Sequence, residues 1–239
     1  MGSDKKECKI KIVKNGPYIV SGNIPLSEKI LHFDGKNMFY LDGQVYEHPE
    51  EYALCSCGKS QTPPFCDGFH KKARFERTEV APRNCFMDRA AKTEGPELDL
   101  WDDKSLCALG RFCYLEEGSA WELTKQSDDP KKRELAIKAA TDCPAGRLVI
   151  MDKKGEAIEP EYEPSIEILQ DPQRGSSGPI FVKGNIPIEA SDGYTYEVRN
   201  RVTLCRCGES KNKPFCDRRH VLMKWTDYKK KLSDYFKLY

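Results

Sequence analysis

Eight residues of this 239-residue sequence repeat one arrangement of metal-binding side chains. The spacing C-x-C-x8-C-x3-H holds for Cys55, Cys57, Cys66 and His70. It holds again, without change, for Cys205, Cys207, Cys216 and His220. Three thiolates and one imidazole suit a small tetrahedral iron or zinc centre. Because so long a spacing is not expected to recur by chance, the sequence predicts two copies of one metal site.

The residues around both sets resemble the signature of the CDGSH (NEET-type) iron–sulfur domains. The first copy reads C-S-C-G-K-S-Q-T-P-P-F-C-D-G-F-H and differs from the signature only at Phe69, where the family has a small residue. The second reads C-R-C-G-E-S-K-N-K-P-F-C-D-R-R-H and differs at Arg218 and Arg219. In that family the three cysteines and the histidine bind one [2Fe–2S] cluster, with the histidine on the outer iron near solvent. The resemblance implies these roles for the eight residues above.

The alternative for the two sets of three cysteines and one histidine is a pair of zinc knuckles, one for each set. Zinc sites usually combine a C-x2-4-C pair with a distant second pair of ligands. The two sets in this sequence are compact and uninterrupted, so we favour iron.

Composition limits the classes of function. Lys and Arg number 39 against 38 Asp and Glu, so no strong overall field indicates a nucleic acid or a cationic substrate. The start of the chain has no apolar stretch typical of a secretory signal, and no run reaches the roughly 18 apolar residues of a membrane helix. We therefore expect a cytoplasmic protein with no membrane span, in which the 11 cysteines serve as metal ligands rather than disulfides.

Internal repetition indicates three units. The segment G-P-Y-I-V-S-G-N-I-P-L at residues 16–26 aligns with G-P-I-F-V-K-G-N-I-P-I at 178–188, and each precedes one of the cysteine sets. The first copy holds extra residues between segment and cysteines, which we expect to lengthen a hairpin with turns at Asp34-Gly35 and Asp42-Gly43. We predict two β-rich modules, residues 1–82 and 159–239, with a different unit, residues 83–158, between them.

Local patterns predict the elements that position these residues. In the middle unit we expect strands at Glu97–Trp101, Trp121–Thr124 and Leu148–Met151. Asp129-Pro130 predicts the start of a helix, since Asp caps helices and Pro suits their first turn. Asp67 and Asp217 are expected to cap short helices that carry the two histidines, and an amphipathic helix is expected from Trp225 to Tyr239.

The middle unit carries a third group of cysteines, in C-A-L-G-R-F-C and D-C-P-A-G. Single-cluster bacterial ferredoxins use C-x2-C-x2-C and a distant C-P. Residues 95–152 resemble the divergent mono-cluster ferredoxin domain, with Gly110 in place of the central cysteine. A four-iron cluster needs one ligand per iron, so this loss favours a [3Fe–4S] cluster on Cys107, Cys113 and Cys143.

Cys85 is the alternative fourth ligand. If it folded back to the other three cysteines it would complete a [4Fe–4S] cluster; otherwise it is a free cysteine. Cys8 has no partner motif, and we interpret it as a cysteine of a β-strand without a metal role.

The sequence thus predicts an α+β protein in which two small CDGSH modules form an intramolecular pseudo-dimer around an inserted ferredoxin-like domain. We expect a monomer with an internal pseudo-two-fold axis, two [2Fe–2S] clusters and one ferredoxin-type cluster. The favoured function is one-electron transfer to or from a redox protein, without catalysis. The alternatives are storage or delivery of pH-labile clusters to an apo iron–sulfur acceptor, and a purely structural role for the clusters.

Overall fold

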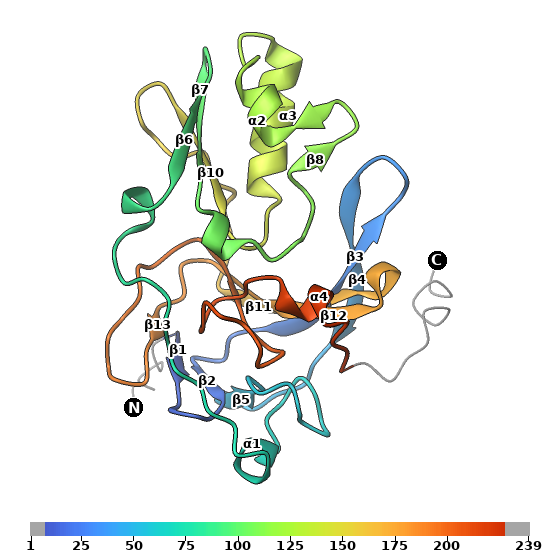
Figure 1. The fold of residues 1–239 in the computed structure, drawn as a ribbon, viewed down its shortest axis with the longest axis vertical. Coiled ribbons are helices and arrows are strands. Elements are labelled where there is room, and N and C mark those ends of the chain that lie inside the picture. Colours follow the sequence, from blue (N-terminus) through green and yellow to red (C-terminus); the bar gives the residue numbers. More distant parts are fainter. Residues whose placement is uncertain (1–7, 228–239) are drawn as a thin grey trace, which may run out of the picture.

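The computed structural model describes residues 8–227 of the chain. It consists mostly of strands with a few short helices, which confirms the predicted α+β class. Segments from the two ends of the sequence lie together in the lower part of Figure 1, and the middle of the sequence forms the upper part. None of the helices in residues 8–227 combines the length and the apolar character needed to cross a bilayer.

Strands from both ends of the chain share a four-stranded sheet. The order is β13-β1-β2-β5, and β1 pairs in parallel with β13, with Ile10 opposite Ile188. The strands are β1 (Lys9–Ile12), β2 (Tyr18–Ser21), β5 (Tyr52–Leu54) and β13 (Ile188–Glu189). Because parallel neighbours cannot be joined by a tight hairpin, this pairing depends on the fold of the whole chain.

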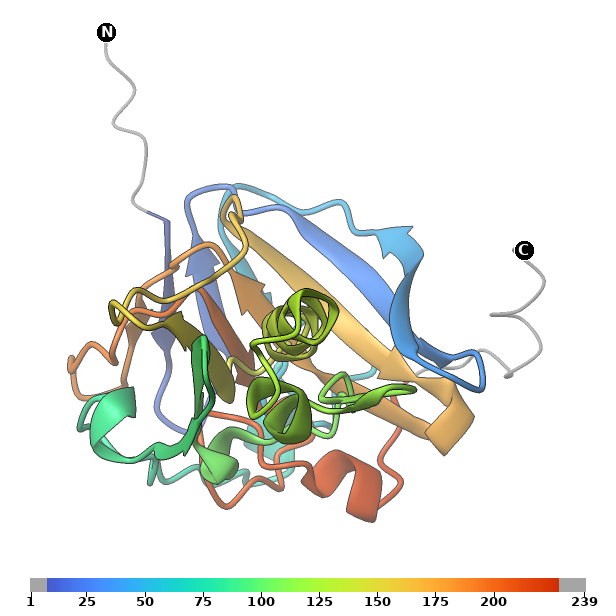
Figure 2. The ribbon, with the colours of Figure 1, turned by 90° about the horizontal axis from the view of Figure 1, so that it is seen from above.

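A five-stranded sheet combines the two ends in the same way. Its order is β14-β12-β11-β3-β4, and β3 pairs in parallel with β11, with Leu26 opposite Ile166 (Figure 2). The strands are β3 (Leu26–Phe33), β4 (Met38–Val45), β11 (Ser165–Asp171), β12 (Ser176–Lys183) and β14 (Arg201–Leu204).

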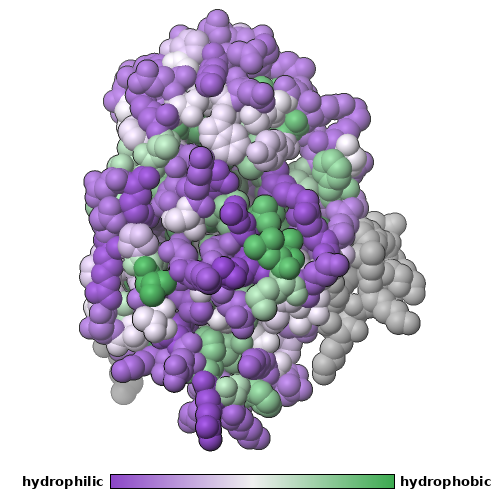
Figure 3. All heavy atoms as spheres, in the orientation of Figure 1, coloured by the Kyte–Doolittle hydropathy of each residue, from purple (hydrophilic) through white to green (hydrophobic). Residues whose placement is uncertain are grey.

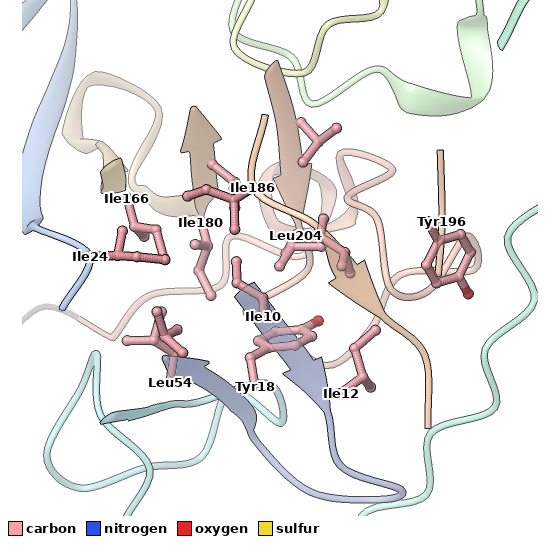
Figure 4. Packing of buried hydrophobic residues seen from close by; sticks show 14 of the residues in the cluster. Ile10, Ile12, Tyr18, Ile24, Leu54, Ile166, Ile180, Ile186, Tyr196 and Leu204 are labelled. Atoms are coloured by element: carbon pink, nitrogen blue, oxygen red, sulfur yellow. The ribbon is translucent and has the colours of Figure 1, made fainter. Parts of the chain in front are cut away.

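One hydrophobic core holds these two sheets together. In Figure 4 the side chains of Ile10, Tyr18 and Leu54 from the first end lie among Ile180 and Leu204 from the second end. All five are nearly inaccessible to solvent. Burial of each such side chain contributes about 1.5–3 kcal/mol, so the two ends stabilise each other through one core rather than two.

The hairpin of the first half confirms one predicted turn and corrects the other. Asp34 accepts hydrogen bonds from the backbone of Lys36 and Asn37 in the turn between β3 and β4. Asp42-Gly43 lies inside β4, so a turn there was a wrong prediction. The strand register shifts opposite this dipeptide, and a Cβ at Gly43 would lie 2.7 Å from a Glu28 carboxylate oxygen. The glycine therefore admits the Glu28 side chain beside the strand.

The middle of the chain forms a three-stranded sheet covered by two helices. The sheet has the order β10-β7-β6, with strands Ala91–Glu94 (β6), Leu98–Asp102 (β7) and Leu148–Asp152 (β10). The other elements are β8 (Tyr114–Leu115), β9 (Gly118–Ser119), α2 (Ala120–Thr124) and α3 (Pro130–Thr141). Leu98, Leu100, Leu148 and Ile150 pack against alanines of α3 in a separate core.

Two predicted strands and the predicted helix start are confirmed in this unit, and one strand was wrong. The Asp129 carboxylate accepts hydrogen bonds from the backbone of Lys131 and Lys132, as an N-cap does. Residues Trp121–Thr124 belong to helix α2 instead of a strand. Ser119 and Glu122 form a reciprocal capping box, which initiates a helix.

Short helices complete the described chain. They are α1 (Phe69–Lys72), η1 (Phe86–Asp88), η2 (Lys104–Leu106), η3 (Pro172–Arg174) and α4 (Arg219–Leu222). Most of the predicted C-terminal amphipathic helix falls in residues 228–239, outside the described residues. Trp225, at its predicted start, lies in irregular structure.

The two C-x-C loops lie against each other through a pair of glycines. Gly58 and Gly208 follow the second cysteine of each loop and have φ of +72° and +81°. A Cβ at Gly58 would lie 2.5 Å from the Cys207 carbonyl oxygen, and one at Gly208 would lie 2.6 Å from the Cys57 carbonyl oxygen. Each loop can therefore approach the other only because both residues lack a side chain.

We expect Gly58→Ala to destabilise the protein more than Gly155→Ala does. Both positions have positive φ, so both alanines carry a backbone cost of about 1–2 kcal/mol. Gly155 faces open space, whereas the Gly58 methyl would overlap the Cys207 carbonyl and add about 1–3 kcal/mol. Urea denaturation of the two variants measures the difference. Equal midpoints would show that the loops do not depend on this contact.

Candidate metal centres

The first two cysteines of each set form a close pair of thiols. Cys55 Sγ lies 3.7 Å from Cys57 Sγ, and Cys205 Sγ lies 3.7 Å from Cys207 Sγ. A disulfide requires about 2.05 Å between the sulfurs, and all four cysteines are free. Two thiolates on one tetrahedral ion, each about 2.3 Å from it, lie about 3.8 Å apart. Each pair therefore has the separation of two ligands of a single metal ion.

The third cysteine and the histidine form a second pair in each set. Cys66 Sγ lies 3.3 Å from His70 Nδ1, and Cys216 Sγ lies 3.3 Å from His220 Nδ1. Within residues 8–227, no group of three or more His, Cys, Asp or Glu side chains is arranged around one ion. The sulfur and nitrogen donors of each set instead form two separate pairs. A [2Fe–2S] centre has this arrangement, with two protein ligands on each iron.

The same backbone hydrogen bonds hold both sets of ligands. In the first copy, Cys55 N donates to Pro64 O, Cys66 N donates to Ala53 O, and Ser60 Oγ donates to Phe65 O. These bonds tie the ligand loop to the end of β5. Their counterparts in the second copy join Cys205 to Pro214, Cys216 to Thr203, and Ser210 to Phe215.

Asp67 and Asp217 tie the loops together without occupying the cap position. The cap residues of α1 and α4 are Gly68 and Arg218, both in left-handed conformation, so the predicted N-caps were one residue off. Asp67 Oδ1 accepts from Phe69 N, and its Oδ2 accepts from Gln61 N at 2.7 Å. The carboxylate thus joins the histidine-bearing turn to the preceding loop, and Asp217 does the same in the second copy.

The first cysteine of each set is biased toward the thiolate form. A hydrogen bond from the Cys57 thiol and further bonds from the backbone of Ser60 and Gly58 lower the pKa of Cys55 to about 6. The corresponding groups around Cys205 lower its pKa to about 7. Backbone N–H groups directed at sulfur stabilise negative charge, which is the form that binds metal.

The two sites differ in how far solvent reaches them. Cys66 and His70 are half-buried, whereas Cys216 is 2% exposed and His220 is 3% exposed. Burial, together with the positive charge of Arg206, lowers the pKa of His220 to about 4. Cys216 packs against Ala108, Ala145 and Cys143 of the middle unit. The middle unit therefore covers the second site and leaves the first site open.

The three cysteines of the middle unit line one small cavity. Cys107 and Cys113 enter it from the loop after η2, and Cys143 enters it from the loop after α3. Burial raises the pKa of Cys113 to about 12, and the nearby sulfurs of Cys143 and Cys107 add to the shift. The three side chains are not arranged around a single ion, but they share one cavity, and a bound cation would compensate the mutual repulsion of three thiolates.

Gly110 occupies the position where a ferredoxin has its central cysteine. A Cβ at Gly110 would lie 3.0 Å from Cδ and 3.2 Å from Cγ of Pro144. The proline of the D-C-P-A-G segment therefore fills the space beside this backbone. The loop therefore leaves little room for a cysteine side chain at position 110.

The other cysteines and histidines are placed elsewhere. Cys85 is exposed at the start of η1, and the residues that line the three-cysteine cavity do not include it. Cys8 precedes β1, and its Sγ lies 3.5 Å from Gly22 O. The ring of His32 contacts Phe39, and that of His48 contacts Tyr52, which agrees with packing roles.

Arg201, which belongs to no recognised motif of the sequence, binds the loop that presents Cys143. Its side chain is 1% exposed and forms an ion pair with Glu159. Its Nη1 donates to three backbone carbonyls at the end of α3, those of Ala140, Thr141 and Cys143, at 2.7–2.9 Å. Helix ends leave carbonyls unsatisfied, and a cation there also interacts favourably with the helix dipole. Strand β14 thus positions Cys143 with Arg201 and leads directly into Cys205.

Arg206 is a second buried arginine, between the cysteines of the second C-x-C loop. It donates to the carbonyls of Gly178 and Leu169, pairs with Asp227, and stacks on Trp225. The first copy has Ser56 at this place. The available sequence signal for both arginines was a positive charge that only the second copy carries, because the first copy has Glu51 in place of Arg201 and Ser56 in place of Arg206.

Comparison with protein-family models identifies the parts of the chain. Residues 15–71 and 177–221 match the family described as iron-binding zinc finger CDGSH type. Residues 93–153 match the family described as divergent 4Fe-4S mono-cluster. Searches of curated proteins and of solved structures find no match. The chain is therefore an iron–sulfur protein with two CDGSH segments on either side of a divergent mono-cluster ferredoxin segment.

We expect Arg201→Met to destabilise the protein by about 3–5 kcal/mol, because it leaves the Glu159 charge and the helix carbonyls without their buried partner. It should also reduce the iron content, since Cys143 loses its positioning contact. Arg174→Met, at an exposed arginine of η3, is the control. Thermal unfolding and iron analysis of both variants test this expectation. An Arg201→Met protein with normal stability and iron would contradict the assigned role.

Proposed function

We propose that this protein transfers single electrons between three iron–sulfur clusters. Each cluster, when bound, accepts and releases one electron. One [2Fe–2S] cluster is assigned to Cys55, Cys57, Cys66 and His70, and another to Cys205, Cys207, Cys216 and His220. A ferredoxin-type cluster is assigned to Cys107, Cys113 and Cys143. We propose an electron carrier rather than an enzyme.

The paired donors support the two [2Fe–2S] assignments. The first two cysteines suit one iron, and the third cysteine with histidine Nδ1 suits the other. The free cysteines and the hydrogen bonds that favour thiolates agree with iron binding. Free thiols also fit a reducing compartment, which supports a cytoplasmic location.

The pairing of strands supports an intramolecular pseudo-dimer. In this proposal residues 1–82 and 159–239 are the two halves, and residues 83–158 are the inserted ferredoxin-like domain. The parallel pairs β1–β13 and β3–β11 join the halves, as does the shared core. The reciprocal contact of Gly58 with Cys207 and of Gly208 with Cys57 is what a two-fold relation between two copies produces. We propose that the protein is a monomer.

The contacts between ligand sets carry the electron-transfer proposal. Cys143 of the middle set packs with Cys216, in the histidine-bearing pair of the second site. The other pair of that site, Cys205 and Cys207, reaches the first site through the glycine contact beside Cys57. The half-buried Cys66 and His70 stand at the far end. These contacts define a path for electrons that leads from the middle unit through the second site to the first site and then to solvent.

For the middle cluster we propose [3Fe–4S], with [4Fe–4S] as the alternative. Three cysteines share the cavity, Pro144 fills the space beside Gly110, and Cys85 is exposed. The family description names a 4Fe-4S cluster, but with the word divergent, which suits a chain that lacks the central cysteine.

We expect the protein as isolated to give the EPR signal of an oxidised [3Fe–4S] centre, and Cys85→Ala to keep it, because oxidised [2Fe–2S] and [4Fe–4S]²⁺ centres are silent. A potentiometric titration followed by EPR should then show reversible one-electron reductions. A silent oxidised sample whose cluster is lost in Cys85→Ala would identify Cys85 as the fourth ligand. Absence of reversible reduction would overturn the electron-transfer proposal.

Delivery of a cluster to an apo iron–sulfur acceptor is the second candidate function, because solvent reaches Cys66 and His70. Protonation of a ligating imidazole removes the lone pair that binds iron. The buried His220, with its pKa lowered to about 4, resists protonation over the range in which an exposed imidazole titrates. Only the first site is therefore placed to release its cluster in mild acid.

We expect acidification from pH 7 to release iron in two phases, the first from the half-buried His70 site and the second at lower pH from the His220 site. His70→Cys should abolish the first phase, and His220→Cys should leave it unchanged, since thiolate replaces the protonatable nitrogen in each. Visible absorbance during stepwise acidification follows both phases. If neither variant alters the release, the histidines are not ligands.

A further inference from the structure

A basic hollow lies where the middle unit meets helix α4. Its volume is about 370 Å³, and four of its lining side chains are cationic against one carboxylate, that of Asp217. The cations are Lys104, Lys211, Arg218 and Arg219. Arg219 is paired with Asp217 at 3.5 Å, while Lys104, Lys211 and Arg218 are exposed. The hollow therefore has a net positive charge directed at solvent.

Exposed apolar side chains adjoin these charges. Leu222, at the end of α4, is 69% exposed and lines the hollow, and the adjacent Met223 is 54% exposed. In Figure 3 a compact hydrophobic patch lies over the α4 region on the front face and is bordered by hydrophilic side chains. An apolar centre within a charged rim is the composition of a protein-binding surface rather than of a site for a free ion.

The hollow also reaches two of the three ligand sets. Cys107 of the middle set lines it, and so do Asp217 and Arg219, which stand next to Cys216 and His220. Asn212 connects the two sides by donating to Ser105 O at 3.0 Å. A partner seated here would lie beside the middle unit and the second site at once.

The opposite charge is found in another cleft of the described chain. That cleft, of about 890 Å³, is lined by Glu159, Glu161, Glu163 and Glu197, together with Arg199 and Arg201. Arg201 is neutralised by Glu159, so carboxylates predominate. An acidic partner would be repelled from the cleft and attracted to the α4 hollow.

We propose that the α4 hollow is the docking surface for an acidic redox protein. The inference rests on the proposed electron-transfer function. The lysines and arginines attract carboxylates of the partner, and Leu222 and Met223 form the desolvated centre of the contact. Electrons then enter or leave beside Cys107 and Cys216. This is one end of the proposed path between the three ligand sets, and the half-buried Cys66 and His70 form the other end.

The test is binding of an acidic [2Fe–2S] ferredoxin to the cluster-loaded protein, by calorimetry at low and high salt, with the rate of electron transfer measured in parallel. Lys104→Glu/Lys211→Glu should weaken binding and slow transfer about 10-fold or more at low salt, and the difference should shrink at high salt. Neither lysine is a proposed ligand. Lys71→Glu/Lys72→Glu makes the same charge change on exposed lysines of α1 and is the matched control.

Unchanged binding in the Lys104→Glu/Lys211→Glu variant, or an equal loss in the α1 control, would overturn the proposed surface. Leu222→Ser, which leaves every charge in place, should also weaken binding if the apolar patch is the centre of the contact. A mediated potentiometric titration needs no docking, so it separates the two claims. If the clusters are reduced normally in the mediated titration but the variants do not affect binding, the proposed docking surface is rejected and the electron-transfer proposal stands.

Discussion

The close approach of the two C-x-C loops is the constraint on which the arrangement of the first two sites depends. Gly58 and Gly208 let each backbone touch the carbonyl of the other loop's second cysteine. Further bonds reinforce this contact, because Tyr18 donates to Cys205 O at 2.8 Å and Trp225 donates to Gly58 O at 3.1 Å. The loops cannot shift independently, so the distance between the two ligand sets is a property of the whole fold.

Arginine side chains hold the loops of the second site and of the middle unit in place. Arg201 holds the Cys143 loop, Arg206 lies between Cys205 and Cys207 in the sequence, and the partly buried Arg147 pairs with Asp102 beside Cys107. A buried charge is tolerated only when its partners are in place. Breaking one of these contacts leaves a buried group without its partner, so the contacts admit only one geometry of the loops they bind.

Two copies of one motif thereby acquire different environments. The middle unit covers Cys216 and His220, whereas solvent reaches Cys66 and His70. In the proposed electron-transfer function, the protected site passes electrons between neighbouring clusters and the open site exchanges them with the surroundings. Duplication of the motif supplies the ligands, and the asymmetric contact with the middle unit supplies the division of roles.

The sequence by itself determined the features that arise within short segments. The cysteines and the histidine of one set are linked by few residues, so their spacing predicts that they lie close together. Asp129-Pro130 predicts its helix because a cap acts on its nearest neighbours. Local patterns failed where they were too short or tertiary packing intervened, as at Trp121–Thr124 and at Asp42-Gly43 beside Glu28. The tertiary structure alone decided that Cys143 packs with Cys216, that His220 is buried and that Arg201 reaches a loop 58 residues away. Such contacts depend on how separate strands and loops assemble, and no local pattern encodes that assembly.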